Sequence, residues 1–218
     1  PAGLGGKGPR ARAAAGPRFV AAGYFTDTLS VVDPGAGERP ATVVALGPRP
    51  LRRLVQAGER LFNDATLCFQ GWQSCASCHD EEGRTDGLNW DLLNDGITNP
   101  KNTRSLLLAH RTPPAMTLGV RADSAAAVRA GIRYIFFSQR SEGEARAMDA
   151  YLKSLRPVAA PPPADPNAVR RGKRLFLKSS TGCATCHPPS DLFTDRKFHD
   201  VGTRGPHDGP EDVFDTPT

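Results

Sequence analysis

The sequence predicts a mainly α-helical protein with two domains of the same type, preceded by a short antiparallel β-meander. Two observations carry the two-domain prediction. The pentapeptide CASCH at residues 75–79 and the pentapeptide CATCH at residues 183–187 share one pattern. Each follows a segment of similar form, GERLF at residues 58–62 and GKRLF at residues 172–176. A repeat of motif and preceding segment indicates a duplicated domain.

Each Cys-X-X-Cys-His pentapeptide is the attachment sequence for a c-type haem. The two thiols add to the vinyl groups of the haem, and the histidine is held beneath the iron as its proximal ligand. Two alternatives are a chance pair of CxxC motifs and one zinc site built from both motifs. Neither alternative requires a histidine directly after the second cysteine, and both motifs have one. The sequence therefore predicts two covalently bound haems c and two cytochrome c-like domains. The predicted attachment and iron-binding residues are Cys75, Cys78, His79, Cys183, Cys186 and His187.

Four segments follow from this pattern. Residues 1–47 are expected to form the β-meander and residues 48–157 the first cytochrome c domain. Residues 158–166, which contain a Pro-Pro-Pro run, form a stiff linker. Residues 167–218 form the N-terminal part of the second cytochrome c domain. This domain is incomplete in the chain, because no methionine and no closing helix follow its haem motif, and we expect the native protein to continue.

Local patterns support these segments. Alternating apolar residues and turns between Arg18 and Leu46 predict a three-stranded meander that resembles one blade of a β-propeller repeat. Apolar residues spaced along residues 51–62 predict a helix before the first haem motif, and residues 142–155 predict a second amphipathic helix. Helix, haem loop and helix together are the plan of a small cytochrome c. Cys68, outside both motifs, is expected to be a small buried residue.

Composition and charge restrict the partners and the cellular compartment that we expect for the protein. The formal charge is +5, but haem propionates would bring the assembled protein close to neutrality, and nothing predicts nucleic-acid binding. No run is long and apolar enough to span a membrane. Covalent haem attachment takes place outside the cytoplasm, so we expect a periplasmic or exported protein. The chain opens on Pro1 without an initiator methionine or a signal peptide, which we interpret as a processed terminus or part of a longer chain.

The sixth ligand decides whether a c-type haem carries electrons or binds a substrate. Met116 follows two prolines, at the place downstream of His79 where small cytochromes carry their methionine ligand. His110 is the alternative sixth ligand of the first haem. Met148, the other methionine, lies on the apolar face of a predicted helix and is interpreted as a core residue.

The second haem has no methionine within the chain. His199 and His207 are the local imidazoles, and each is interpreted as a hydrogen-bonded loop histidine. The sixth ligand of this haem therefore lies beyond Thr218, or the position is open.

Longer stretches resemble the bacterial di-haem cytochrome c peroxidase and MauG-like family, from about Leu51 to Thr218. They are residues 102–106, Pro113-Pro114 with Arg121, residues 197–202 and residues 215–217. Residues 68–79 and 87–96 resemble a subgroup of this family that is associated with propeller repeats. The resemblance implies an electron-transferring haem, a peroxidatic haem that reduces hydrogen peroxide, and a redox partner protein.

The resemblance also implies a calcium ion between the domains, with Asn102 at the position of a side-chain ligand and Thr216-Pro217 near the carbonyl positions. An ordinary turn or cap role for Asn102 fits the sequence equally well. The chain departs from the family because no histidine lies between His79 and His110, and because residues 132–137 are apolar where an acidic residue is expected.

Without that acid–base group the first haem looks like an electron carrier. The function predicted is electron transfer with peroxide reduction at one haem. The alternative is a non-catalytic electron-transfer subunit of a larger redox assembly.

Overall fold

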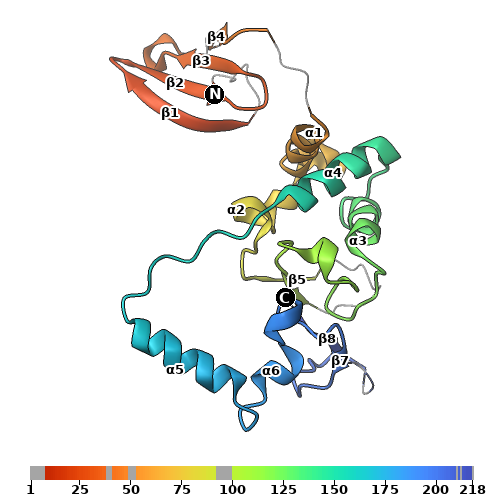
Figure 1. Ribbon diagram of the computed structural model, residues 1–218. Coiled ribbons are helices and arrows are strands. Elements are labelled where there is room, and N and C mark those ends of the chain that lie inside the picture. The colour runs from red at the N-terminus through yellow and green to blue at the C-terminus, as the bar shows by residue number, and fades with distance from the viewer. Residues whose placement is uncertain are drawn as a thin grey trace. The chain divides into compact units, whose positions relative to one another are not determined.

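The computed structural model describes residues 8–37, 41–48, 53–91, 100–209, 211 and 213–217. It contains two compact units, Pro1–Arg53 and Leu54–Thr218, which are described separately below (Figure 1). Leu51, expected in the first helix, and residues 92–96 of the family-like stretch lie outside the described residues. Within the described part of the chain, no helix has the length and apolar character needed to cross a membrane.

The first unit contains one antiparallel sheet with its strands in chain order. The strands are β1 (Pro9–Ala15), β2 (Arg18–Gly23), β3 (Thr28–Val32) and β4 (Thr42–Ala45). Strands β2 to β4 match the expected meander, and β1 is a fourth strand that was not predicted. All seven residues of β1, PRARAAA, are exposed, and the strand has none of the β-branched or aromatic residues that mark a strand in sequence.

Two helices form the core of the second unit, α1 (Leu54–Phe62) and α4 (Glu142–Ser154). They cross at Gly58, where an added Cβ would lie 1.9 Å from the carbonyl oxygen of Ala147. The ring of Phe62 packs against Tyr151 with a centroid distance of 5.2 Å. Both helices agree with their predicted ranges to within a few residues, and the close crossing explains the glycine.

The start of α4 accounts for the carboxylates in its first turn. Ser141 and Glu144 form a reciprocal capping box, which satisfies amide groups that would otherwise lack partners. Glu142 Oε1 lies 2.6 Å from Arg129 Nη2, and Arg129 Nη1 lies 2.9 Å from Asp149 Oδ2. These ion pairs tie α4 to α3 (Ser124–Ala130), a helix that begins after the cap residue Asp123.

A π-helical turn, Gly131–Ile135, directly continues α3. This turn and α3 were not predicted as helix, although the Asp123 cap is a recognisable start signal. The remaining α-helices and strands of the second unit are short, apart from one helix of 12 residues. They are α2 (Asp80–Gly83), β5 (Asn89–Trp90), β6 (Lys101–Asn102), α5 (Pro166–Leu177), α6 (Cys183–Cys186), β7 (Phe198–His199) and β8 (Phe214–Asp215).

Helix α5 repeats the sequence of α1 but not its environment. None of its residues is buried. A Cβ added at Gly172, the counterpart of Gly58, would meet nothing within 4 Å. Among the described residues, therefore, no helix crosses α5 as α4 crosses α1.

Candidate haem sites

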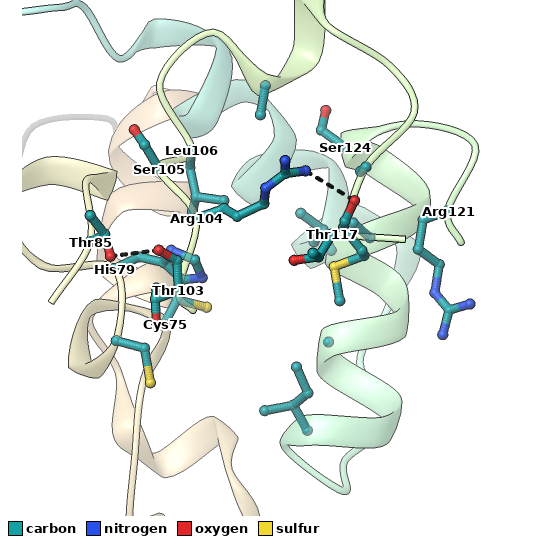
Figure 2. A pocket seen from close by; sticks show the side chains of 18 of the residues that line it. Cys75, His79, Thr85, Thr103, Arg104, Ser105, Leu106, Thr117, Arg121 and Ser124 are labelled. Atoms are coloured by element: carbon teal, nitrogen blue, oxygen red, sulfur yellow. Dashed lines mark hydrogen bonds between the residues drawn. The ribbon is translucent and has the colours of Figure 1, made fainter. Parts of the chain in front are cut away.

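A cavity of about 830 Å³ lies beside the α1–α4 core. Its volume is within the range of small-molecule and cofactor pockets, about 300–1,000 Å³. Cys75, Cys78 and His79 line it, together with apolar side chains such as Phe62 and Phe136. Figure 2 shows Cys75 and His79 among the side chains of its wall. The first haem motif thus opens onto a largely apolar space.

The attachment cysteines of this motif are held in a tight turn. Residues Cys75–Ser77 form a 3-10 turn, and the hydroxyl groups of Ser74 and Ser77 cap its start. Burial raises the pKa of the Cys75 thiol to about 12, and burial also raises the pKa of Cys78. Both thiols are therefore neutral at physiological pH, and both line the largely apolar cavity that would hold the vinyl groups of a haem.

His79 follows the two cysteines into the cavity. Its Nδ1 is buried and has no hydrogen-bond partner among the described residues. A buried polar atom without a partner is rare in folded proteins and calls for an explanation. Burial lowers the pKa of the imidazole, which favours the neutral form that binds metals. These residues fit a covalently attached haem with His79 as the proximal ligand.

The Met116 loop (residues 114–121) forms another part of the cavity wall. Ala115 and Arg121 pair as an isolated antiparallel bridge that closes the loop, and Gly119 N–H donates to the Met116 carbonyl at 3.0 Å. Met116 lines the cavity, whereas His110 is not among the lining residues. Met148 also lines the cavity, but it is 1% exposed within the core of the unit.

Arg104 connects this loop to the end of the chain. Its Nη1 donates to the Met116 carbonyl at 3.1 Å and to Asp215 Oδ2 at 3.1 Å. In Figure 2 the Arg104 side chain extends from the side of the cavity that holds His79 toward the segment around Thr117. Burial raises the pKa of the Asp215 carboxyl, while Arg104 acts in the opposite direction. In the sequence, Arg104 and Asp215 stand out only as parts of stretches that resemble the family.

The second haem motif has the same backbone hydrogen bonds as the first. In both, the histidine N–H donates to the carbonyl of the first cysteine, at 2.9 Å in the first motif and 3.0 Å in the second. A later aspartate N–H donates to the carbonyl of the second cysteine. The distance is 3.0 Å for Asp86 in the first motif and 2.9 Å for Asp195 in the second. The duplication therefore extends to loop geometry beyond the pentapeptides.

The surroundings of the second motif are more open. Cys183 is exposed and Cys186 is half-buried. His187 Nδ1 lies 2.7 Å from the Phe193 carbonyl, so that Nδ1 carries the hydrogen and Nε2 keeps a free lone pair for iron. His199 Nε2 lies 2.8 Å from Asp195 Oδ2, so the histidine is hydrogen-bonded as expected, but it lies in strand β7 and not in a loop.

The cavity wall also includes Asn102, Thr216 and Pro217, the residues at the calcium positions of the family pattern. The Asn102 amide donates from Nδ2 to the carbonyls of Gly87 and Leu88, at 3.1 and 3.4 Å. These bonds use the amide nitrogen and leave Oδ1 available as an oxygen ligand. Calcium binding at Asn102 stays a prediction.

A bound haem supplies an iron that changes its oxidation state, and this chain supplies the surroundings. The cysteines would fix the group, the histidines would bind its iron, and the apolar side chains of the cavity would exclude water. Paired helices beside a Cys-X-X-Cys-His loop and its cavity define a c-type cytochrome. The family model described as di-haem cytochrome c peroxidase matches residues 52–163. The chain therefore belongs to the di-haem cytochrome c peroxidase family, a family that implies haem c cofactors.

Two curated relatives extend the similarity. Hydrazine synthase subunit gamma from Kuenenia stuttgartiensis is 34% identical over 78% of this chain and 56% of its own length. Methylamine utilization protein MauG from Methylorubrum extorquens is 29% identical over 83% of this chain and 62% of its own length. The chain thus spans between about half and two thirds of each relative.

Solved structures agree with the fold. A structure of hydrazine synthase from Kuenenia stuttgartiensis, determined under xenon pressure, matches with a TM-score of 0.66 and 29% identity. The match covers 78% of this chain and 72% of the other. A MauG-like protein associated with microbial copper homeostasis matches with a TM-score of 0.58 and 19% identity, over 80% of this chain and 68% of the other. The second likeness concerns the fold alone.

Proposed function

We propose that this chain is a periplasmic di-haem c-type cytochrome that exchanges electrons between its two haems and a redox partner protein. The observation that carries the proposal is that His79 and Met116 line one cavity together with the attachment cysteines. A histidine and a methionine as axial ligands give an electron-transferring haem with a raised reduction potential. The matching loop geometry of the two motifs supports a second haem at Cys183, Cys186 and His187.

The first haem is the electron carrier in this proposal. Asp215 is the single acidic side chain among the described residues that line its cavity, and Arg104 holds that carboxylate. Cleavage of peroxide needs a positioned acid–base group and a free position on the iron. We therefore assign reduction of hydrogen peroxide to the second haem site, where Cys183, Cys186 and His187 would hold the haem. The reaction would consume two electrons and two protons for each peroxide and release two waters.

Substitution of each of the two methionines of the chain in turn tests whether Met116 is the sixth ligand of the first haem. Replacing methionine by leucine removes the thioether sulfur and nearly conserves volume. We expect Met116→Leu to convert the first ferric haem to a high-spin species and to lower its potential, while Met148→Leu keeps the low-spin spectrum. If Met116→Leu leaves the spectrum unchanged and His110→Gln alters it, His110 is the ligand and this part of the proposal is wrong.

A non-catalytic subunit of a larger redox assembly is the second candidate. It is favoured by the similarity to hydrazine synthase subunit gamma, which is named as a subunit, and by the exposed apolar residues Val169, Leu175 and Leu177 on α5. Ferric spectra of the haem-loaded protein separate the two candidates. A high-spin signal that shifts on addition of peroxide or cyanide supports catalysis. Two haems that stay low-spin in both redox states support the non-catalytic subunit.

The proposal includes a calcium ion at Asn102, supported by the position of Asn102 and Thr216 in one cavity wall. Carboxamide and backbone carbonyl oxygens are ligands that calcium accepts. Calcium titration of the chelator-treated protein, followed by calorimetry, should show one site that Asn102→Ala removes. Equal binding by the variant would place the ion elsewhere.

A further inference from the structure

The second haem domain makes direct contacts with the Met116 loop of the first. The loop carries Gly119 at a φ of 61°, and an added Cβ there would lie 2.4 Å from Cζ of Phe198. Strand β8 reaches the same loop, where the Asp215 N–H donates to the Thr117 carbonyl at 3.0 Å. Residues nearly a hundred positions apart in sequence thus form one contact region.

Arg104 joins the two sides of this region. Its Nη1 reaches the Met116 carbonyl and Asp215 Oδ2, both at 3.1 Å, and its Nη2 reaches the Asp215 carbonyl at 2.8 Å. The Asp215 side chain is 6% exposed and that of Arg104 26%. A planar guanidinium can hold several acceptors in fixed directions, and a partly buried charge-assisted bond is stronger than an exposed one.

Met116 has a backbone conformation that needs support. Its φ is 76°, in the left-handed region that residues with a side chain rarely adopt. Such a conformation persists when surrounding contacts determine it, and it is concentrated at ligand clamps and active sites. The carbonyl of Met116 accepts from Arg104 and from Gly119 N–H, so Arg104 acts at the strained residue itself.

We propose that Arg104 and Asp215 form an inter-domain latch by which the second haem domain holds Met116 on the iron of the first haem. Both are positioning residues that act through the Met116 backbone. This inference rests on the proposed ligation by Met116. Closing the latch keeps the first haem six-coordinate, and opening it frees a coordination position without changing any ligand residue.

The latch is also connected to the proximal loop of the second haem. Thr216, next to Asp215, accepts at its carbonyl from the Thr194 hydroxyl at 2.8 Å. Thr194 is 1% exposed and directly follows Phe193, whose carbonyl contacts His187. A continuous set of short contacts therefore runs from the histidine of one haem to the methionine of the other.

The test compares variants of the full chain carrying its covalent haems. Arg104→Gln and Asp215→Asn remove the ion pair, Arg104→Lys keeps the charge but loses the planar arrangement, and Met116→Leu is the reference for an open first haem. Asp208→Asn is the matched control, because Asp208 forms a different ion pair between these regions, 2.8 Å from Lys101, whereas Arg104 pairs with Asp215.

We expect Arg104→Gln and Asp215→Asn to show the same high-spin ferric signal as Met116→Leu. Both variants should also bind cyanide about tenfold or more faster than wild type, because each loses a charge-assisted hydrogen bond. Arg104→Lys should be intermediate, and Asp208→Asn should match wild type. Hydrogen exchange of residues 114–121 should accelerate in the latch variants alone.

Met116→Leu could give the high-spin signal of the first haem while the three latch variants retain the wild-type spectrum and rate of cyanide binding. In that case the latch proposal is wrong and Met116 remains the proposed ligand. If Met116→Leu changes nothing, the proposed ligand itself is wrong. An equal effect of Asp208→Asn would indicate general loosening of the domain contact and would also overturn the latch. Should Arg104→Gln fail to fold, Asp215→Asn and Arg104→Lys decide the outcome.

Discussion

Gly58 and the carbonyl oxygen of Ala147 define the closest approach of the two core helices, since a Cβ on Gly58 would lie 1.9 Å from that oxygen. The clash involves backbone atoms, so rotation of a side chain cannot relieve it. The crossing brings Phe62 and Leu152 to the wall of the haem cavity. A single glycine thus permits the close approach of α1 and α4 beside the cavity.

Gly58 and Gly172 occupy equivalent positions in the two repeated segments and form a matched pair for mutation. Gly58→Ala should destabilise the chain by about 3 kcal/mol, at the upper end of the cost of overpacking a core. Gly172→Ala, on the exposed face of α5, should stabilise it by up to about 1 kcal/mol, because alanine is the better helix former. Urea unfolding of both variants measures the difference. Equal effects would contradict the close crossing of α1 and α4.

The first turn of α4 predicts a dependence of stability on pH. Arg129 lowers the pKa of Glu142 below its ordinary value of 4.5. A carboxylate with a lowered folded pKa stabilises the fold above its unfolded pKa, and this contribution is lost as the pH falls through the folded value. Glu142→Gln should therefore lower the melting temperature near neutral pH and have little effect in strong acid. Glu211→Gln, at an exposed position, serves as control, and a difference that persists in strong acid would exclude this pairing as the cause.

The thiols of the haem-free polypeptide should differ in reactivity. With a pKa of about 12, only about one Cys75 thiol in ten thousand is ionised at about pH 8, and the thiolate is the reactive form. Cys183 is exposed and should be alkylated by iodoacetamide at least about tenfold faster. Peptide mass spectrometry gives both rates. Labelling of Cys75 should accelerate as the pH rises, and in urea the two rates should become similar; equal rates in the folded chain would contradict the burial of Cys75.

Features with a local signal were predictable from the sequence. The apolar spacing of α1 and α4 and the repeated pentapeptides each lie within a few residues, and the structure has the helices at the expected places. Burial of Cys68, which is 4% exposed, was expected from its neighbours. Strand β1 was missed because it has no buried face, and its sequence, PRARAAA, holds no β-branched or aromatic residue that favours a strand.

The contacts around Met116 had no such signal. Arg104 and Asp215 are 111 positions apart, and neither belongs to a motif whose chemistry predicts an ion pair. Their meeting depends on the path of the chain through the linker and the second haem loop. The sequence could therefore place Met116 in a loop after two prolines, but not the residues that hold its backbone.

The position of Asp215, Thr216 and Pro217 in the wall of the first haem cavity has a consequence for how this protein can be divided. The last described residues complete a pocket whose other walls come from a segment that ends before the linker. The cavity beside Cys75 and His79 is thus built from segments that are discontinuous in sequence. A fragment cut at the linker would keep Cys75, Cys78, His79 and Met116 and still lack the part of the cavity wall that residues 215–217 form, so the two halves are not interchangeable modules.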